Sequence, residues 1–188
     1  MKTFRTVVST TPSPNPISHA DRILLLGSCF ADAIGERLER FKFAATANPF
    51  GVIYNPISIH RLLHYAISNQ VPPEHSYLTH NEVHLNFDLH SKVSTLDRTA
   101  LQERIRQMTE NAHQVIRNAS RVFITYGTAW VYRRRDTGEI VANCHKQPQA
   151  LFERSLLSAT DIVSSFEETN SLLKKMNPNV GTILTVSP

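Results

Sequence analysis

The sequence predicts an α/β domain with a mostly parallel central sheet. Short apolar runs of strand length alternate along the chain with amphipathic segments of helix length. Strands that are separated by helices pair in parallel through right-handed crossovers, which gives a doubly wound sheet. Because 188 residues with 41% hydrophobic content can bury a core of their own, we expect residues 1–188 to form a single domain.

Two strands and two helices are predicted in the first half of the chain. The three prolines within residues 1–20 exclude a helix or a central strand there, so this segment is expected to be an extended lead-in. Arg22–Leu26 is a continuous apolar run, typical of a strand buried on both faces, and Lys42–Ala47 is predicted as a second strand. Between them, Cys29–Phe41 carries apolar residues at helical spacings, which indicates an amphipathic helix. A second helix follows Pro56.

The second half of the chain adds two helices and two strands. Asp97 is suited to cap a long helix whose apolar residues fall on one face. Arg121–Tyr126 is predicted as a third buried strand. Ser158–Met176 opens with a loose capping box and ends before a proline, which indicates another helix. Gly181–Val186 is predicted as the fourth strand.

The basic residues favour a solvated turn over a nucleic-acid site. The formal net charge is +4, but the only dense basic cluster is Arg133–Arg135. It lies between the segments Ala129–Tyr132 and Ile140–Ala142 and precedes Asp136–Gly138, so we predict the tip of a β-hairpin. Because no aromatic residues are interleaved with the arginines, we expect no nucleic-acid partner. These arginines could still bind an anionic substrate.

Nothing in the sequence indicates a membrane span or an export signal. The apolar runs are of strand length, and the N-terminal residues lack the apolar stretch of a secretory signal. Two cysteines do not make a disulfide framework, so reduced thiols are the expected state. We therefore expect a cytoplasmic protein, while its oligomeric state is not predicted.

Polar residues follow each predicted strand. The strand ends pair a small or turn-forming residue with a hydroxyl, amide or thiol group: Gly27–Cys29, Asn48–Gly51, Tyr126–Thr128 and Ser187–Pro188. In open parallel sheets, ligands bind at the carboxyl ends of the strands. Ser28 lies in a strand-to-helix turn, where backbone N–H groups and the helix dipole would stabilise an oxyanion. From position alone, Ser28 is explained equally well as a helix cap and as a nucleophile.

The turn sequence Gly27-Ser28-Cys29-Phe30-Ala31 is the one after which the GSCFA family is named. The chain resembles this family in five further blocks, in order: Asn48–Gly51 with Tyr54–Pro56, Asp88–Ser91, Gly127–Tyr132, Val141–Lys146 and Thr185–Pro188. The family looks like a branch of the SGNH (GDSL-like) hydrolases, which cleave esters, often on carbohydrates or lipids. The resemblance implies a flavodoxin-like, three-layer α/β/α fold with an inserted hairpin or small β region.

The resemblance also implies roles for individual residues. Ser28 matches the nucleophile, and Gly51 matches the glycine whose backbone N–H joins the oxyanion hole. The wider group of hydrolases has an asparagine two residues after the glycine of the third block, where this chain has Ala129. The side-chain donor is therefore expected from Thr128 or Asn143.

The general base implied by the resemblance is a histidine in the loop after the last strand, shortly beyond Pro188. We therefore expect a domain truncated at its C-terminus, which carries the nucleophile without its base. His145 could approach the site instead, but a hydrogen bond that orders its own loop is the favoured interpretation. A nucleophilic pair of Cys29 and His145 is a further alternative, against which we favour a Cys29 packed beneath the turn.

The segment His84–His90 alternates strictly between polar and apolar residues, which predicts a strand with one polar face. His84, Asp88 and His90 on that face could bind zinc or manganese, but a solvated edge strand is the favoured interpretation. We expect no bound metal and no cofactor. Five residues are predicted substrate contacts: Asn48, Asn55, His90, Asn143 and His145.

These observations favour a serine esterase or acyl-transfer hydrolase that uses Ser28 on a small-molecule or carbohydrate ester. A non-catalytic module that binds a glycan or an acylated ligand on the same fold is the first alternative. A metal-dependent hydrolase built on His84, Asp88 and His90 is the second. The sequence does not discriminate among ester substrates.

Overall fold

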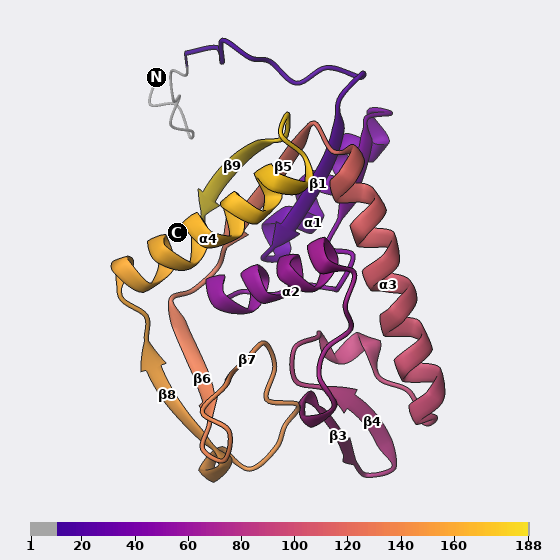
Figure 1. The fold of residues 1–188 in the computed structure, drawn as a ribbon, viewed down its shortest axis with the longest axis vertical. Helices are drawn as coiled ribbons and strands as arrows, with labels where there is room; N and C mark the ends of the chain where they lie inside the picture. Colours follow the sequence, from indigo (N-terminus) through magenta and orange to yellow (C-terminus); the bar gives the residue numbers. More distant parts are fainter. Residues whose placement is uncertain (1–10, 188) are drawn as a thin grey trace, which may run out of the picture.

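The computed structural model describes residues 11–187 and confirms the predicted α/β class (Figure 1). Its centre is a parallel sheet of four strands in the order β2-β1-β5-β9. The strands are β1 Arg22–Gly27, β2 Ala44–Ala47, β5 Arg121–Tyr126 and β9 Gly181–Val186. The helices are α1 Cys29–Arg40, α2 Pro56–Ser68, α3 Arg98–Asn118 and α4 Ala159–Met176. None of the helices within residues 11–187 combines the length and the apolar character needed to cross a membrane.

The two faces of the sheet are buried under different helices, which makes the three predicted layers. Leu24 and Leu26 of β1 are buried together with residues of α2, α3 and α4. Ile23 and Leu25 are buried together with residues of α1. Successive side chains of a strand point to opposite faces, so a strand covered on both sides needs the continuous apolar run that predicted β1.

The long helices begin at the predicted capping residues. Asp97 accepts hydrogen bonds from the Thr99 and Ala100 N–H groups at the start of α3. Ser158 and Asp161 form a reciprocal capping box at the start of α4. These bonds satisfy N–H groups that no carbonyl within the helix reaches, so the sequence sets where both helices start.

Two small antiparallel sheets lie beyond the carboxyl ends of the parallel strands (Figure 1). One pairs β3 Tyr77–His80 with β4 Val83–Asn86. In the other, β6 Trp130–Arg134 and β7 Ile140–Val141 form the predicted hairpin, and β8 Phe152–Leu156 pairs with the second edge of β6. Short 3₁₀ helices complete the connections: η1 Glu74–Ser76, η2 Ser91–Val93 and η3 Gln149–Leu151. The small β region is therefore confirmed, while the strands β3 and β8 are not predicted by the sequence patterns.

Two local predictions are wrong. The alternating segment His84–His90 is a strand only as far as Asn86, because the Leu89 N–H donates to the Asn86 carbonyl and turns the chain. Arg134 does not lie in a solvated turn. Its side chain is 15% exposed, and its guanidinium lies over the Phe87 ring at 4.6 Å from the ring centroid. This arginine holds the hairpin against the segment that follows β4.

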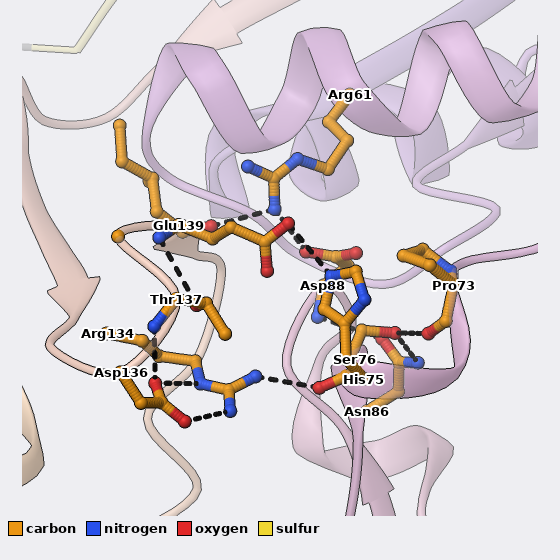
Figure 2. A network of polar contacts seen from close by, with 12 residues as sticks. Arg61, Pro73, His75, Ser76, Asn86, Asp88, Arg134, Asp136, Thr137 and Glu139 are labelled. Carbon is orange, nitrogen blue, oxygen red and sulfur yellow. Dashed lines mark hydrogen bonds and ion pairs between the residues drawn. The ribbon is translucent and has the colours of Figure 1, made fainter.

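A polar network ties the antiparallel sheets to α2 (Figure 2). Arg61 of α2 donates to the Asp88 carboxylate at 2.7 Å and to the Ile140 carbonyl at 2.8 Å. Arg134 of β6 donates to the His75 carbonyl at 2.7 Å. These bonds connect α2, η1, the turn after β4 and the hairpin, so they fix the small sheets relative to the parallel sheet.

Candidate functional site

Gly27 shapes the turn that places Ser28 at the end of β1. Its φ is +127°, and a β-carbon at this position would stand 2.0 Å from the Thr125 carbonyl oxygen, so only glycine fits. The Ser28 N–H donates to the same Thr125 oxygen at 3.1 Å, which binds the turn to β5. Ser28 is thereby fixed directly before α1.

The Ser28 hydroxyl lies where the ends of three strands meet. It accepts a hydrogen bond from the Phe30 N–H at 3.4 Å, as the cap of α1, and it lies 3.1 Å from the Ser187 hydroxyl after β9. From the end of β5, a β-carbon on Gly127 would stand 3.2 Å from the Ser28 β-carbon. Ser28 itself is 2% exposed. The structure therefore brings three of the predicted polar strand ends together around one buried hydroxyl, and it adds a direct contact between Ser28 and Ser187, which was predicted only as part of a strand end.

Asn48 brings the end of the fourth strand, β2, to the same turn. Its side-chain oxygen accepts from the Gly27 N–H at 2.8 Å, and its amide nitrogen donates to the Asp32 carboxylate at 2.6 Å. Both ends of the amide are engaged, and the residue is buried. Asn48 is therefore a positioning residue that holds β2 to β1 and α1, and its contact with a substrate stays a prediction.

The backbone donors expected to form an oxyanion hole are engaged elsewhere. The Gly51 N–H donates to the Asn48 carbonyl at 2.7 Å in the turn after β2, so it does not perform the predicted role in this conformation. The Ser28 N–H is already bonded to β5. The Thr128 hydroxyl accepts from the Trp130 N–H at 3.1 Å, which leaves its proton available to a ligand. Of these groups, Thr128 keeps a donor that the described residues do not use.

Cys29, the first residue of α1, is exposed, so the predicted packing beneath the turn is wrong. The Ser28 side chain is buried in the turn, and the side chain of the next residue, Cys29, points toward solvent. In the first turn of α1, the Phe30 N–H bonds to the Ser28 hydroxyl and the Ala31 N–H bonds to the Ser28 carbonyl. Within residues 11–187 the Cys29 N–H has no such acceptor, as is usual for the first N–H of a helix. This N–H is an additional donor beside Ser28.

His145 forms the predicted hydrogen bond that orders its loop. Its Nε2 lies 2.7 Å from the Asn86 carbonyl oxygen. Because a carbonyl only accepts, Nε2 carries the proton and Nδ1 is an unprotonated acceptor. Nδ1 is buried without a hydrogen-bond partner in the part of the chain that the structure describes. Burial lowers the pKa of His145, the hydrogen bond to the Asn86 carbonyl partly opposes this shift, and the nearby His90 adds to the lowering.

His90 lies between His145 and the turn after β2. A β-carbon on Gly51 would stand 2.7 Å from the His90 β-carbon, and His90 lies near His145. The Asn143 side-chain oxygen accepts a hydrogen bond from the backbone N–H of His145 at 2.8 Å. The structure therefore gathers Gly51, His90, Asn143 and His145 in a second group. The hydrogen-bond partners of the Ser28 hydroxyl are Phe30 and Ser187, and His145 bonds to Asn86 instead.

Asn55 has a structural position. It is 5% exposed, and its side-chain oxygen caps α2 by accepting from the Ser58 N–H at 2.8 Å. Its amide nitrogen donates to the Val141 carbonyl at 3.3 Å. Asn55 therefore joins α2 to β7, and it presents no free polar atom of the kind that the predicted substrate contact requires.

The metal site proposed for His84, Asp88 and His90 does not form. The His84 ring is bonded to the Thr79 hydroxyl at 2.9 Å, and Asp88 is paired with Arg61. Within residues 11–187, no group of three or more histidine, cysteine, aspartate or glutamate side chains could hold a metal ion. The alternation that suggested a shared face ends at Asn86 with β4, which is why these side chains do not converge.

Comparison with known proteins identifies one family. The family model described as GSCFA family matches residues 22–188, which includes every strand end of the site. No match was found among the curated proteins or among the solved structures.

Proposed function

The chain belongs to the GSCFA family, and on this premise we propose that it is an SGNH-type serine esterase or acyl-transfer hydrolase with Ser28 as the nucleophile. The observation that carries the proposal is the position of the Ser28 hydroxyl, at the start of α1 and 3.1 Å from the Ser187 hydroxyl. A serine in a strand-to-helix turn, surrounded by other strand ends, has the placement that acyl transfer requires. The substrate class we propose is an ester.

The position of Ser187 supports a general base downstream of β9. A serine hydroxyl is a weak nucleophile until a base accepts its proton. Ser187 directly follows β9 and its hydroxyl lies 3.1 Å from the Ser28 hydroxyl, so the chain leaves β9 beside the proposed nucleophile. We therefore place the proposed base, a histidine, in the segment after Ser187 and not at His145.

Two donors support stabilisation of the developing oxyanion. The Cys29 N–H lies at the positive end of the α1 dipole, and the Thr128 hydroxyl keeps a proton to donate. The Gly51 N–H would join them only if its bond to the Asn48 carbonyl opened. This turn is therefore the element that we expect to rearrange when a substrate reaches Ser28.

A fluorophosphonate probe tests the proposal on the full-length protein. Wild-type protein should be labelled, and mass spectrometry should find the adduct on the peptide that contains Ser28. Ser28→Ala should abolish labelling, whereas the control variant Ser155→Ala, which removes a serine of β8, should be labelled like wild type. Equal labelling of wild type and Ser28→Ala, with both variants folded by circular dichroism, would overturn the assignment.

A second candidate is a binding module that holds an ester or a glycan without turning it over. It is favoured by the burial of Ser28, at 2% exposure, and by the engaged Gly51 N–H. This candidate predicts ligand binding by a full-length protein that neither reacts with the probe nor hydrolyses p-nitrophenyl acetate. Both candidates carry forward the expected cytoplasmic location, which the two free cysteines support.

A further inference from the structure

One face of the β7-β6-β8 sheet is open and aromatic. Trp130 and Tyr132 are two residues apart on β6 and therefore share a face. Their directly opposed partners on β8 are Leu156 and Arg154. Trp130 is 43% exposed, Tyr132 38% and Leu156 60%. Large apolar and aromatic groups gathered in this way on a soluble domain mark a binding surface.

The aromatic ring of Trp130 is held in a fixed orientation. The Arg154 guanidinium lies 4.0 Å from the ring centroid, close enough for a cation–π interaction. Farther along the same face, Phe152 and Val141 are buried against Phe87. One end of the face is therefore anchored in a small apolar cluster, and the other end presents a pre-oriented indole.

A cavity of about 440 Å³ lies beside Tyr132 on this face. Its lining combines one phenol, three amide side chains and apolar groups: Tyr132, Asn143, Gln147, Gln149, Val141 and Phe152. The Asn143 side-chain nitrogen and the Gln149 amide have no partner within residues 11–187, although the Asn143 oxygen is used by His145. The volume falls within the roughly 300–1,000 Å³ of small-molecule sites.

We propose that this face, defined by Trp130, Tyr132 and the adjoining cavity, binds the pyranose rings of an oligosaccharide. A pyranose presents C–H groups on its face, which match the electron-rich face of an aromatic ring. Its hydroxyl groups both donate and accept, as the amides of asparagine and glutamine do. A phosphate would require converging cations, but the cavity lining includes no charged residue and the Arg154 guanidinium is engaged on the Trp130 ring. An acyl chain would leave the unpaired amides buried, which is costly.

The face begins at the edge of the Ser28 site. The Trp130 N–H donates to the Thr128 hydroxyl at 3.1 Å, and Thr128 follows Gly127, which lies against Ser28. Trp130 is therefore three positions along the chain from the residue that packs against Ser28. If Ser28 is the nucleophile, a sugar bound on this face would carry the ester that Ser28 attacks, and this assignment rests on the proposed function. Binding of the sugar by the face does not depend on the proposed function.

Trp130 is the single tryptophan of residues 1–188, so the part of the emission that Trp130→Phe removes reports directly on the face. Full-length protein is titrated with xylohexaose, cellohexaose, chitohexaose and oligogalacturonate. At least one should change the emission saturably and protect Trp130 from quenching by acrylamide. By calorimetry, Trp130→Ala and Tyr132→Ala should weaken that binding by about tenfold or more, whereas Trp130→Phe, which keeps a ring, should retain most of it.

The outcomes separate this inference from the proposed function. No emission change with any of the four oligosaccharides would overturn it, as would binding that both alanine variants retain. Trp130→Ala and Tyr132→Ala should keep the circular dichroism spectrum and the urea-unfolding midpoint of the wild type, which shows that both variants are folded. Ser28→Ala should still bind the sugar. If the probe never labels Ser28 but the sugar binds through Trp130, only the esterase proposal fails.

Discussion

The parallel sheet and the antiparallel end of the molecule are held together by different forces. In the parallel sheet, β1 is buried on both faces by aliphatic side chains, which come from all four helices, and the strands are in register through backbone hydrogen bonds. The antiparallel end has a small apolar cluster around Phe87. It otherwise depends on the ion pairs and on the side-chain hydrogen bonds drawn in Figure 2. Burial of apolar surface is non-directional, whereas each polar bond needs a specific partner in a specific geometry.

Because of this difference, the two regions should respond differently to single substitutions. An aliphatic core resists the loss of one contact because many neighbours remain, although each lost methylene still costs free energy. A buried polar network fails more abruptly, because a removed partner leaves a desolvated group unpaired. The two proposed surfaces fall in different regions, since the Ser28 turn ends a strand of the parallel sheet, whereas Trp130 of the proposed sugar-binding face lies on β6.

The largest effect is expected from the aliphatic core. Leu24 is 0% exposed, so Leu24→Ala should lower the free energy of unfolding by about 2–5 kcal/mol through lost burial and a residual cavity. Leu156→Ala, at an exposed position, is the matched control and should change it by less than about 0.5 kcal/mol. Urea unfolding measures both. A loss below about 1 kcal/mol for Leu24→Ala would show that β1 is not the centre of stability.

The sequence predicted the parallel sheet well because its signals are local. The bounds of β5 and β9 agree with the predicted strands, and the Asp97 and Ser158 caps were visible as short motifs. In contrast, β8 has a Phe-Glu-Arg-Ser-Leu sequence without strict alternation, and it is a strand because it pairs with β6. Its pairing is set by tertiary contacts, which no local pattern contains.

The site was predicted in part for the same reason. Turn residues at strand ends pointed to Ser28, and the topology of a parallel sheet predicted that such ends meet. The engagement of Asn48, Asn55 and Gly51 depends on contacts with residues elsewhere in the fold. Whether a polar group is free or bonded follows from packing, so the sequence identified the location of the site better than the role of each residue.

A buried polar contact inside the helical layers gives the next effect. His60 is 1% exposed, with Nε2 2.7 Å from the Tyr126 hydroxyl and Nδ1 2.7 Å from the Ser165 hydroxyl. Burial, with a smaller contribution from His64, lowers the pKa of His60 from 6.5 to about 4. The unfolded chain therefore binds a proton more tightly than the folded one between these two pH values.

The free energy of unfolding should consequently be highest above pH 6.5 and should fall as the pH falls toward about 4. At about 1.4 kcal/mol for each pKa unit, His60 accounts for a loss of about 3 kcal/mol across this window. Urea unfolding at several pH values measures the slope, which should be shallower in His60→Gln. It should not vanish, because burial also lowers the pKa of His64 and His145. Identical slopes in both proteins would contradict the assignment.

A smaller and more local effect is expected at the centre of the polar network. Asp88 is 2% exposed, and it accepts from Arg61 at 2.7 Å and from the Tyr65 hydroxyl at 3.0 Å. Asp88→Asn should cost about 2 kcal/mol, because two charge-assisted bonds weaken and Arg61 loses its charged partner while keeping its bond to the Ile140 carbonyl. Amide hydrogen exchange should accelerate in β4 and β7 more than in β1 and β5. Arg61→Met combined with Asp88→Asn should cost less than the sum of the two single variants, and additive losses would show that the pair is not coupled.

The smallest effect is expected at the exposed rim of the same network. His75 lies 2.9 Å from the Glu139 carboxylate, with the two side chains 49% and 37% exposed. Water screens this pair, so Glu139→Gln should lower the free energy of unfolding by no more than about 0.5–1 kcal/mol and should leave hydrogen exchange in β4 and β7 unchanged. Asp88→Asn is the comparison variant, because it removes a buried carboxylate of the same network. The ratio of the two losses in the free energy of unfolding measures how much burial adds to a polar contact. If Glu139→Gln cost as much as Asp88→Asn, the antiparallel end would be held from its rim, and the distinction drawn between a buried polar anchor and a solvated periphery would be wrong.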